Sequence, residues 1–298
     1  MKKIHFPTFL KSVACLILAG AIVPAALAVP KKVLVVSVTE GFPHSSIPTA
    51  EKVLTELGKK SQAFEVVGIV HSGPKPREGA DLDAWTSKVK SALAEKMSTD
   101  ALKNYDAIIF ANTTGILPLP DKQGFLDWIK AGHGFVAIHS GSDTFHGPNN
   151  TVDPYSEMLG GEFKTHGAQV GVECMVQDPK HPATRHLGKS FVVNVEEVYQ
   201  FKNYDPAKVH ELLTLDKHPN DKTPGHFAVA WCKNYGEGRV FYTSLGHRED
   251  VWDAEWVDAK GKRANPPGVS EAYQKHLLGG IKWALGLEPG DATPQTKN

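Results

Sequence analysis

The sequence has few cysteines and no excess of either charge, and these absences exclude several classes of protein. Of the three cysteines in 298 residues, Cys15 lies near the N-terminus, and Cys174 and Cys232 are too few for a disulfide scaffold. The residues alone leave open whether these two pair or remain free thiols. Lysine and arginine number 33, as do aspartate and glutamate, and no basic stripe is present. We therefore expect no nucleic-acid partner.

Several catalytic motifs are also missing. The chain contains no H-E-x-x-H, no C-x-x-C and no Gly-x-Ser-x-Gly. A zinc site carried by one helix and a serine nucleophile on a sharp strand-to-helix turn are therefore not indicated. We also expect no nucleotide cofactor. Any metal ligands must come from separate loops.

The N-terminal segment has the pattern of a secretory signal peptide. Lys2 and Lys3 precede an apolar run at 13–23 that is too short to span a bilayer, and Ala-Leu-Ala at 26–28 supplies a small-residue cleavage site. We predict cleavage after Ala28 and export to a bacterial periplasm, with no membrane anchor afterwards. An uncleaved anchor is the alternative. Removal of residues 1–28 leaves 270 residues (298 − 28), enough for one large domain.

Strand and helix patterns alternate through the first half of the remaining chain. Continuous apolar runs predict buried strands at 33–38, 64–70, 106–111 and 134–138, and helical periodicity predicts helices at 47–57, 85–97 and 121–130. This alternation is typical of a flavodoxin-like, doubly wound, mostly parallel α/β sheet.

The pattern changes after residue 150. Strands are predicted at 170–176, 191–201, 211–215, 227–233 and 239–244, and the glycine-rich residues 234–238 connect the last two as a β-hairpin. A helix follows whose apolar face is Tyr273, Leu277, Ile281 and Leu285. We predict a single domain at 31–287 and a polar tail at 288–298, which we expect to be disordered.

Polar side chains follow four of these strands, where ligands bind in such sheets. The sequence GFVAIHSGSDTFHG at 134–147 breaks from an apolar strand directly into His139. Glu196 and Glu197 interrupt a strand pattern, so one carboxylate should face inward. The candidate catalytic residues are His139, His247, Asp143 and Glu197, and the candidate substrate-binding residues are His44, Ser45, Asn112, Ser140 and Trp252. The candidate metal ligands are His139, His166 and His247.

Three mechanisms could use this set. A histidine and a carboxylate could act as general base and acid. Two or three imidazoles could instead bind a divalent metal, for which zinc or manganese is expected. Nucleophilic attack by Ser140 beside His139 is the third and ranks last, since adjacent side chains point apart as often as together.

Nearly the whole mature chain, roughly residues 31–287, resembles the ThuA-like family. The resemblance rests on GFPHSSI at 41–47, GFVAIHSGSDTF at 134–145, GGEFKTH at 160–166, HP at 181–182, EEVYQF at 196–201 and YGEGRVFYTSLGHRED at 235–250. That family is named for trehalose utilisation and belongs to the class I glutamine amidotransferase-like superfamily. The resemblance implies that fold with an added β-hairpin.

The resemblance also changes the expected chemistry. Relatives in the superfamily place a nucleophilic cysteine on the elbow that here contains His139, so transfer of the glutamine amide has no nucleophile. The family's association with sugar catabolism, often beside oxidoreductases that make 3-keto sugars, suggests an enzyme acting on a 3-keto sugar or glycoside. A sugar isomerase, lyase or hydrolase would fit. The sequence also allows a homo-oligomer.

The alternative is a catalytically silent carbohydrate-binding or accessory module on the same scaffold. An enzyme should bring His44, His139, His166 and His247 around one point. A binding module should instead present an open groove with exposed aromatic side chains, for which Trp252, Trp256, Phe145 and Tyr199 are available.

Overall fold

Nine strands form one sheet whose two halves differ in strand direction. The computed structural model describes residues 1–3 and 29–295, so the predicted signal peptide falls almost wholly outside the described residues. The strand order is β2-β1-β3-β4-β11-β10-β9-β6-β7. Pairs from β2 to β11 are parallel and pairs from β11 to β7 are antiparallel. The predicted fold class is confirmed, although the antiparallel extension is larger than one hairpin.

The strands and helices match the sequence pattern closely in the first half. The strands of the large sheet are β1 (Lys31–Ser37), β2 (Phe64–His71), β3 (Ala107–Ala111), β4 (Gly134–Ile138), β6 (Val170–Val176), β7 (Ser190–Glu196), β9 (His210–Lys217), β10 (Pro224–Tyr235) and β11 (Gly238–Thr243). The α-helices are α1 (Ile47–Ser61), α2 (Ala80–Met97), α3 (Thr99–Leu102), α4 (Lys122–Lys130), α5 (Pro154–Leu159), α6 (Glu249–Trp252) and α7 (Pro267–Ala284). Short 3-10 helices are η1 (His139–Asp143), η2 (Pro148–Asn150) and η3 (Pro206–Lys208).

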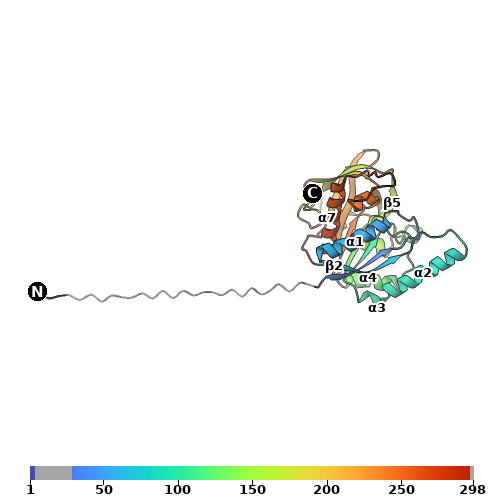
Figure 1. Cartoon of the computed structure of the whole chain (residues 1–298), viewed down its shortest axis with the longest axis horizontal. Helices are drawn as coiled ribbons and strands as arrows, with labels where there is room; N and C mark the ends of the chain where they lie inside the picture. Colours follow the sequence, from blue (N-terminus) through green and yellow to red (C-terminus); the bar gives the residue numbers. More distant parts are fainter. Residues whose placement is uncertain (4–28, 296–298) are drawn as a thin grey trace.

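Helices cover both faces of the sheet (Figure 1). Alternate residues of β1 separate the two cores: Val33 and Val35 pack with α1 and α7, whereas Leu34 and Val36 pack with α2, α4 and α5. This arrangement explains why the first strands are apolar without alternation, since a strand covered on both faces buries every side chain. None of the helices in the described ranges is long and apolar enough to cross a bilayer.

One predicted strand is wrong. The apolar pattern at 191–201 predicts a single strand, but the structure divides it into β7 and β8 (Tyr199–Lys202). The second piece leaves the large sheet and pairs with β5 (Glu162–His166) in a separate two-stranded sheet. The residues between them, Glu197 and Val198, are buried. This break carries Glu197 to the carboxyl edge of the parallel strands.

The C-terminal segment also differs from expectation. Its polar sequence suggests disorder, yet up to Gln295 it lies against the body of the protein. The guanidinium of Arg185 contacts the carboxylate of Glu288 at 2.6 Å, and the Nδ1–H of His210 donates to the backbone oxygen of Thr293 at 2.7 Å. Local polarity therefore gave the wrong prediction because these contacts come from distant parts of the chain.

The two cysteines outside the N-terminal segment are free and buried. Cys174 lies in β6 and Cys232 in β10, and β9 runs between these strands. Two strand spacings amount to about 9–10 Å, which exceeds the Cα separation that a disulfide allows. The alternative of two free thiols is the one that the fold supports.

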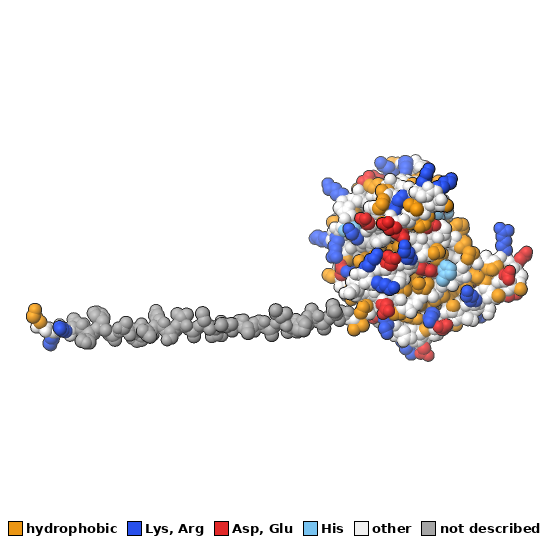
Figure 2. All heavy atoms as spheres, in the orientation of Figure 1, with side chains coloured by type: hydrophobic (Ala, Val, Ile, Leu, Met, Phe, Trp, Pro, Cys, Tyr) orange, Lys and Arg blue, Asp and Glu red, His pale blue; other side chains and the backbone are white. Residues whose placement is uncertain are grey.

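Charged side chains are interspersed on the surface. Figure 2 shows lysines and arginines next to aspartates and glutamates over the visible face, without a large area of one sign.

Candidate functional site

The strand ends bring the predicted polar residues to one edge of the sheet. His44 lies between β1 and α1, Asn112 follows β3, His139 follows β4, and His247 follows β11. Because β4 pairs in parallel with both β3 and β11, their carboxyl ends are adjacent. Glu197 reaches the same edge from the break after β7.

His139 leaves β4 through a sharp change of backbone direction. Ile138 is extended, whereas His139 begins η1 with φ of 50°. A positive φ is uncommon for any residue except glycine and concentrates at functional sites. The turn therefore presents an imidazole with the backbone geometry of an elbow.

Four side chains form a compact cluster that we call the histidine centre: His44, His139, Glu197 and His247. Candidate ligand atoms from all four lie within 4.8 Å of one another. The Nε2 of His139 is 3.2 Å from the Nδ1 of His247 and 3.7 Å from Oε1 of Glu197. The same Oε1 is 3.3 Å from the Nδ1 of His247.

Further contacts involve three members of the histidine centre, His139, His44 and Glu197. The Nδ1–H of His139 donates to the backbone oxygen of Ser244 at 2.7 Å. In the neutral imidazole, Nε2 therefore carries a lone pair. His44 Nδ1 is 3.3 Å from the hydroxyl of Ser140, and Oε2 of Glu197 is 3.0 Å from the Nδ1 of His166. The hydrogen bonds of His139 and His44 are of the outer kind that fixes the tautomer and orientation of ligands in metal sites. The Nδ1–H of His166 donates to the Gly167 carbonyl oxygen and lies only at ion-pair distance from Glu197.

Burial favours neutral imidazoles in part of the centre. It lowers the pKa of His139 well below the usual value, and the neighbouring His44 and His247 act in the same direction. Burial, with a further contribution from His247, lowers the pKa of His44 to about 4. For His247 burial also lowers the pKa, but the Glu197 carboxylate outweighs it and the net shift is upward.

The residue types of the histidine centre fit a divalent metal ion. A neutral imidazole and a carboxylate oxygen are common ligands of zinc and of other first-row metals. Three imidazoles and one carboxylate with mutually close donor atoms could therefore hold one ion. His166 is not part of this set: it was predicted as a ligand, but its Nδ1 contacts the outer oxygen of Glu197.

A cavity of about 230 Å³ opens beside the histidine centre. Its lining consists of Phe42, His44, Asp143, Phe163, His166, Glu197, Tyr199 and His247. His139 lies behind this wall, 0% exposed, with its ring 4.3 Å from the ring of Tyr199. A small molecule in the cavity would touch His44 and His247, whereas His139 would act through the centre.

The predicted substrate-binding residues divide into two groups. His44 lines the cavity. Ser140 does not, but its hydroxyl contacts the imidazole of His44. Ser45 is exposed and lines a neighbouring hollow instead, together with Ile47 and His71. Asn112 is wholly buried, and its side-chain amide donates to the Ser46 hydroxyl and to the Gly246 carbonyl oxygen at 3.1 Å each.

The prediction that Trp252 binds substrate is wrong. Its side chain is 0% exposed, and its indole N–H donates to the Gly246 carbonyl oxygen at 2.8 Å. Position 246 requires glycine, since φ is 118° and an added Cβ would lie 2.6 Å from the Tyr273 hydroxyl. Trp252 and Asn112 therefore fix the turn that carries His247.

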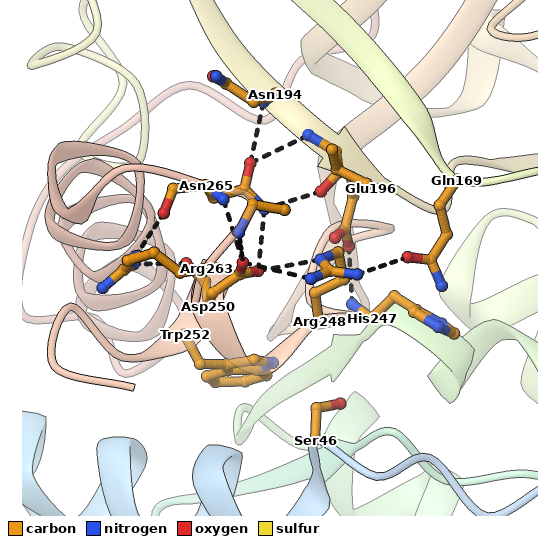
Figure 3. Close-up of polar contacts among 12 residues, drawn as sticks. Ser46, Gln169, Asn194, Glu196, His247, Arg248, Asp250, Trp252, Arg263 and Asn265 are labelled. Carbon is orange, nitrogen blue, oxygen red and sulfur yellow. Dashed lines mark hydrogen bonds and ion pairs between the residues drawn. The ribbon is translucent and has the colours of Figure 1, made fainter. Parts of the chain in front are cut away.

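Glu196 supports this turn from the other side. One carboxylate oxygen accepts from the backbone N–H of Gly246 and from that of His247, both at 2.7 Å. Burial raises its pKa to about 7 despite these bonds. Figure 3 shows Glu196 beside the backbone of His247, and beyond it Arg248, Asp250 and Asn265 in one polar network.

The exposed aromatic groove predicted for a binding module is also not found among the named residues. Trp252, Phe145 and Tyr199 are buried, although Tyr199 lines the cavity. Trp256 is half-buried and does not belong to the lining. The sequence reasoning missed Phe42 and Phe163, which line it as well. Phe42 directly precedes Pro43 and His44 in the GFPHSSI motif. This position next to a candidate site residue could have identified Phe42 as part of the lining.

Comparisons with known proteins agree with this architecture. A family model described as trehalose utilisation, ThuA, matches residues 32–264. The structure is similar to a ThuA-like protein of Parabacteroides merdae, at 16% identity and a TM-score of 0.61, covering 86% of this chain and 90% of that one. It is also similar to a ThuA-like protein of Bacteroides uniformis, at 21% identity and a TM-score of 0.56, covering 88% and 94%. No curated protein matches the sequence.

Proposed function

The chain belongs to the ThuA family of trehalose utilisation, and from this premise we propose that it is an enzyme acting on an oxidised sugar. The substrate class is a 3-keto sugar or glycoside, and the chemistry is acid–base or metal-assisted. The observation that carries the proposal is the histidine centre, because its donor atoms lie within 4.8 Å at the wall of a cavity sized for one small molecule.

We propose zinc or manganese as the ion of this centre. His139 would contribute Nε2, since its Nδ1 is bonded to Ser244, and Glu197 and His247 would bind beside it. His44 would complete the set. A divalent ion in such a position supplies a Lewis acid that polarises a carbonyl oxygen. The chain itself favours the neutral form of His139 and His44 by burying them, orients the ligands and shields His139 from water.

Transfer of the glutamine amide is not part of the proposal. His139 lies at the elbow that carries cysteine in amidotransferases, and Cys174 and Cys232 lie inside strands. Burial raises the pKa of Cys174 to about 12 and that of Cys232 well above its usual value. Neither thiol offers an exposed thiolate for attack.

A carbohydrate-binding module without catalysis is the second candidate. Phe42 favours it, because this side chain is 65% exposed at the edge of the cavity and could stack against a sugar ring. Against it stand the buried ligand-type residues, since sugar binding alone does not need a carboxylate between three imidazoles.

Export to the periplasm remains part of the proposal. It is supported by the pattern of residues 1–28 alone. Mass measurement of the protein recovered from a periplasmic extract tests it: a chain that begins at residue 29 is expected, and an uncleaved chain in the cytoplasm would contradict it.

Turnover of 3-keto glucosides tests the enzymatic function. The mature protein is stripped with a chelator, reloaded with zinc or manganese, and compared with His139→Asn, a substitution chosen because asparagine tolerates positive φ. His226→Asn, which pairs with Glu211 outside the cavity lining, is the control. Loss of turnover in the first variant and not in the second is expected. Full activity of His139→Asn would overturn the proposal.

A further inference from the structure

His146 lies between two carboxylates, of which one, Asp143, lines the cavity. Its Nε2 is 2.9 Å from Oδ1 of Asp143, and its Nδ1 is 2.6 Å from Oε1 of Glu162. Since a carboxylate accepts hydrogen bonds, both ring nitrogens carry a proton in this arrangement. The hydrogen bond with Asp143, opposed by partial burial and reinforced by Glu162, raises the pKa of His146 to about 9.

The far end of this arrangement is firmly anchored. Glu162 is 1% exposed and also contacts the ammonium of Lys202 at 2.9 Å and the side-chain amide of Asn203 at 2.8 Å. Burial raises the pKa of Glu162, but His146, Lys202 and Asn203 outweigh it and the net shift is downward. A fixed anion on the β5–β8 pair therefore holds the imidazolium in place.

The near end faces the cavity. Asp143 ends η1 and lines the cavity, and its backbone oxygen accepts from the N–H of Gly115 at 2.8 Å. Oδ1 is occupied by His146. Among the described residues, Oδ2 has no hydrogen-bond partner. Asp143 thus combines a fixed backbone, a fixed rotamer and one available carboxylate oxygen.

The other carboxylate of the lining is engaged. Glu197 uses Oε1 toward His139 and His247 and Oε2 toward His166. Both its oxygens are therefore directed to imidazoles. Of the two carboxylates that line the cavity, Asp143 is the one with an oxygen available for a substrate.

We propose that Asp143 is the base that removes a proton from the carbon next to the substrate's ketone, and that His146, held by Glu162, is its positioning residue. This inference rests on the proposed function and assigns its first chemical step. The C–H bond breaks and its proton passes to Oδ2 of Asp143. The electron pair forms a carbon–carbon double bond, and the carbonyl π pair moves to the ketone oxygen, giving an enolate. Return of the proton regenerates the ketone, so no oxidant or reductant is required.

Hydrogen–deuterium exchange tests this step directly. Methyl 3-keto-glucoside is incubated in D₂O with the metal-loaded mature protein, and the loss of signals from hydrogens beside the ketone is followed by ¹H NMR. Binding of the same compound is measured in parallel by calorimetry. Asp143→Asn is expected to lower the exchange rate by roughly 10²–10⁴-fold, the usual contribution of a general base, with little change in Kd.

Control variants separate positioning from folding. Asp127→Asn makes the same substitution at an exposed residue of α4 and should exchange at the wild-type rate. His146→Gln retains one N–H donor and should keep more of the exchange rate than His146→Leu, while both bind with similar Kd. If both His146 variants lose binding affinity and melting temperature equally, without a specific loss of exchange rate, the role of His146 is merely structural. This result would overturn its assignment as a positioning residue.

The outcomes distinguish the two proposals. Exchange that persists in Asp143→Asn at the wild-type rate overturns the assignment of the base and leaves the proposed function intact. Binding without exchange in the wild-type protein overturns the enolisation step but keeps a sugar site. Absence of both binding and exchange contradicts the proposed function and this inference together.

Discussion

The imidazole of His139 donates from Nδ1 to the backbone oxygen of Ser244 at 2.7 Å. This bond joins the ends of two neighbouring parallel strands, since Ile138 of β4 pairs with Thr243 of β11. It directs the lone pair of Nε2 toward His247 and Glu197. The sheet topology thus sets the tautomer at the centre of the site.

Acid should weaken the polar network behind His247. Asp250 is fully buried and accepts from the backbone N–H groups of Ala264 and Asn265 and from Arg248 (Figure 3). Burial raises the pKa of Asp250, but Arg248 and Asn265 outweigh it and the net shift is downward. A lowered pKa contributes stability above the ordinary value near 3.8, and this contribution is lost as pH falls below that value.

The variant Asp250→Asn measures this contribution. At pH 7 we expect a loss of about 3–5 kcal/mol, the usual cost of breaking a buried ion pair, in urea unfolding. The gap between wild type and variant should narrow at pH 3. Asp216→Asn, exposed on β9, is the control and should change little. A gap that is equal at both pH values would contradict the assigned charge.

Alkali should weaken the contacts of His146. Its pKa is raised from 6.5 to about 9, so its stabilising charge is fully present below pH 6.5 and is lost as pH rises through 9. We expect His146→Gln to melt below the wild type at pH 6 and close to it at pH 10. Calorimetric scans at the two pH values check this. A difference that persists unchanged at pH 10 would argue against an imidazolium.

Both buried cysteines should resist modification in the folded protein. Cys174 and Cys232 are 0% exposed and unpaired. Alkylation under native conditions should leave both unmodified, and alkylation in denaturant without a reducing agent should label both. Peptide mass mapping reads the two positions separately. A disulfide-linked peptide pair would contradict the strand spacing described above.

The parallel half of the sheet could be predicted from sequence because its strands are buried on both faces. The division of 191–201 into β7 and β8 could not, since neither glycine nor proline interrupts that stretch. The strand is divided by a tertiary contact. The side chain of Glu196 accepts hydrogen bonds from the backbone N–H groups of Gly246 and His247. The same break places Glu197 in the histidine centre.

The convergence of the candidate residues was predictable where a strand ends in an unusual residue. His139 and His247 were found in this way, and they meet because parallel strands share one edge. The contact of His166 with Glu197, the burial of Trp252 and the bridge made by His146 depend on β5, α6 and η1 folding against that edge. No spacing in the sequence encodes those distances.

Metal binding by the histidine centre tests the central claim most directly. Apo protein is equilibrated with zinc or manganese, the ion content is measured by mass spectrometry, and the ligands are identified by X-ray absorption. We predict one ion per chain, bound by imidazole and carboxylate. His139→Asn and Glu197→Gln should each lower the affinity for the ion by more than the about 10–100-fold expected for loss of an outer hydrogen bond. His226→Asn should bind as the wild type does. An apo protein that binds no ion, or binds it equally well in all three variants, would contradict the account.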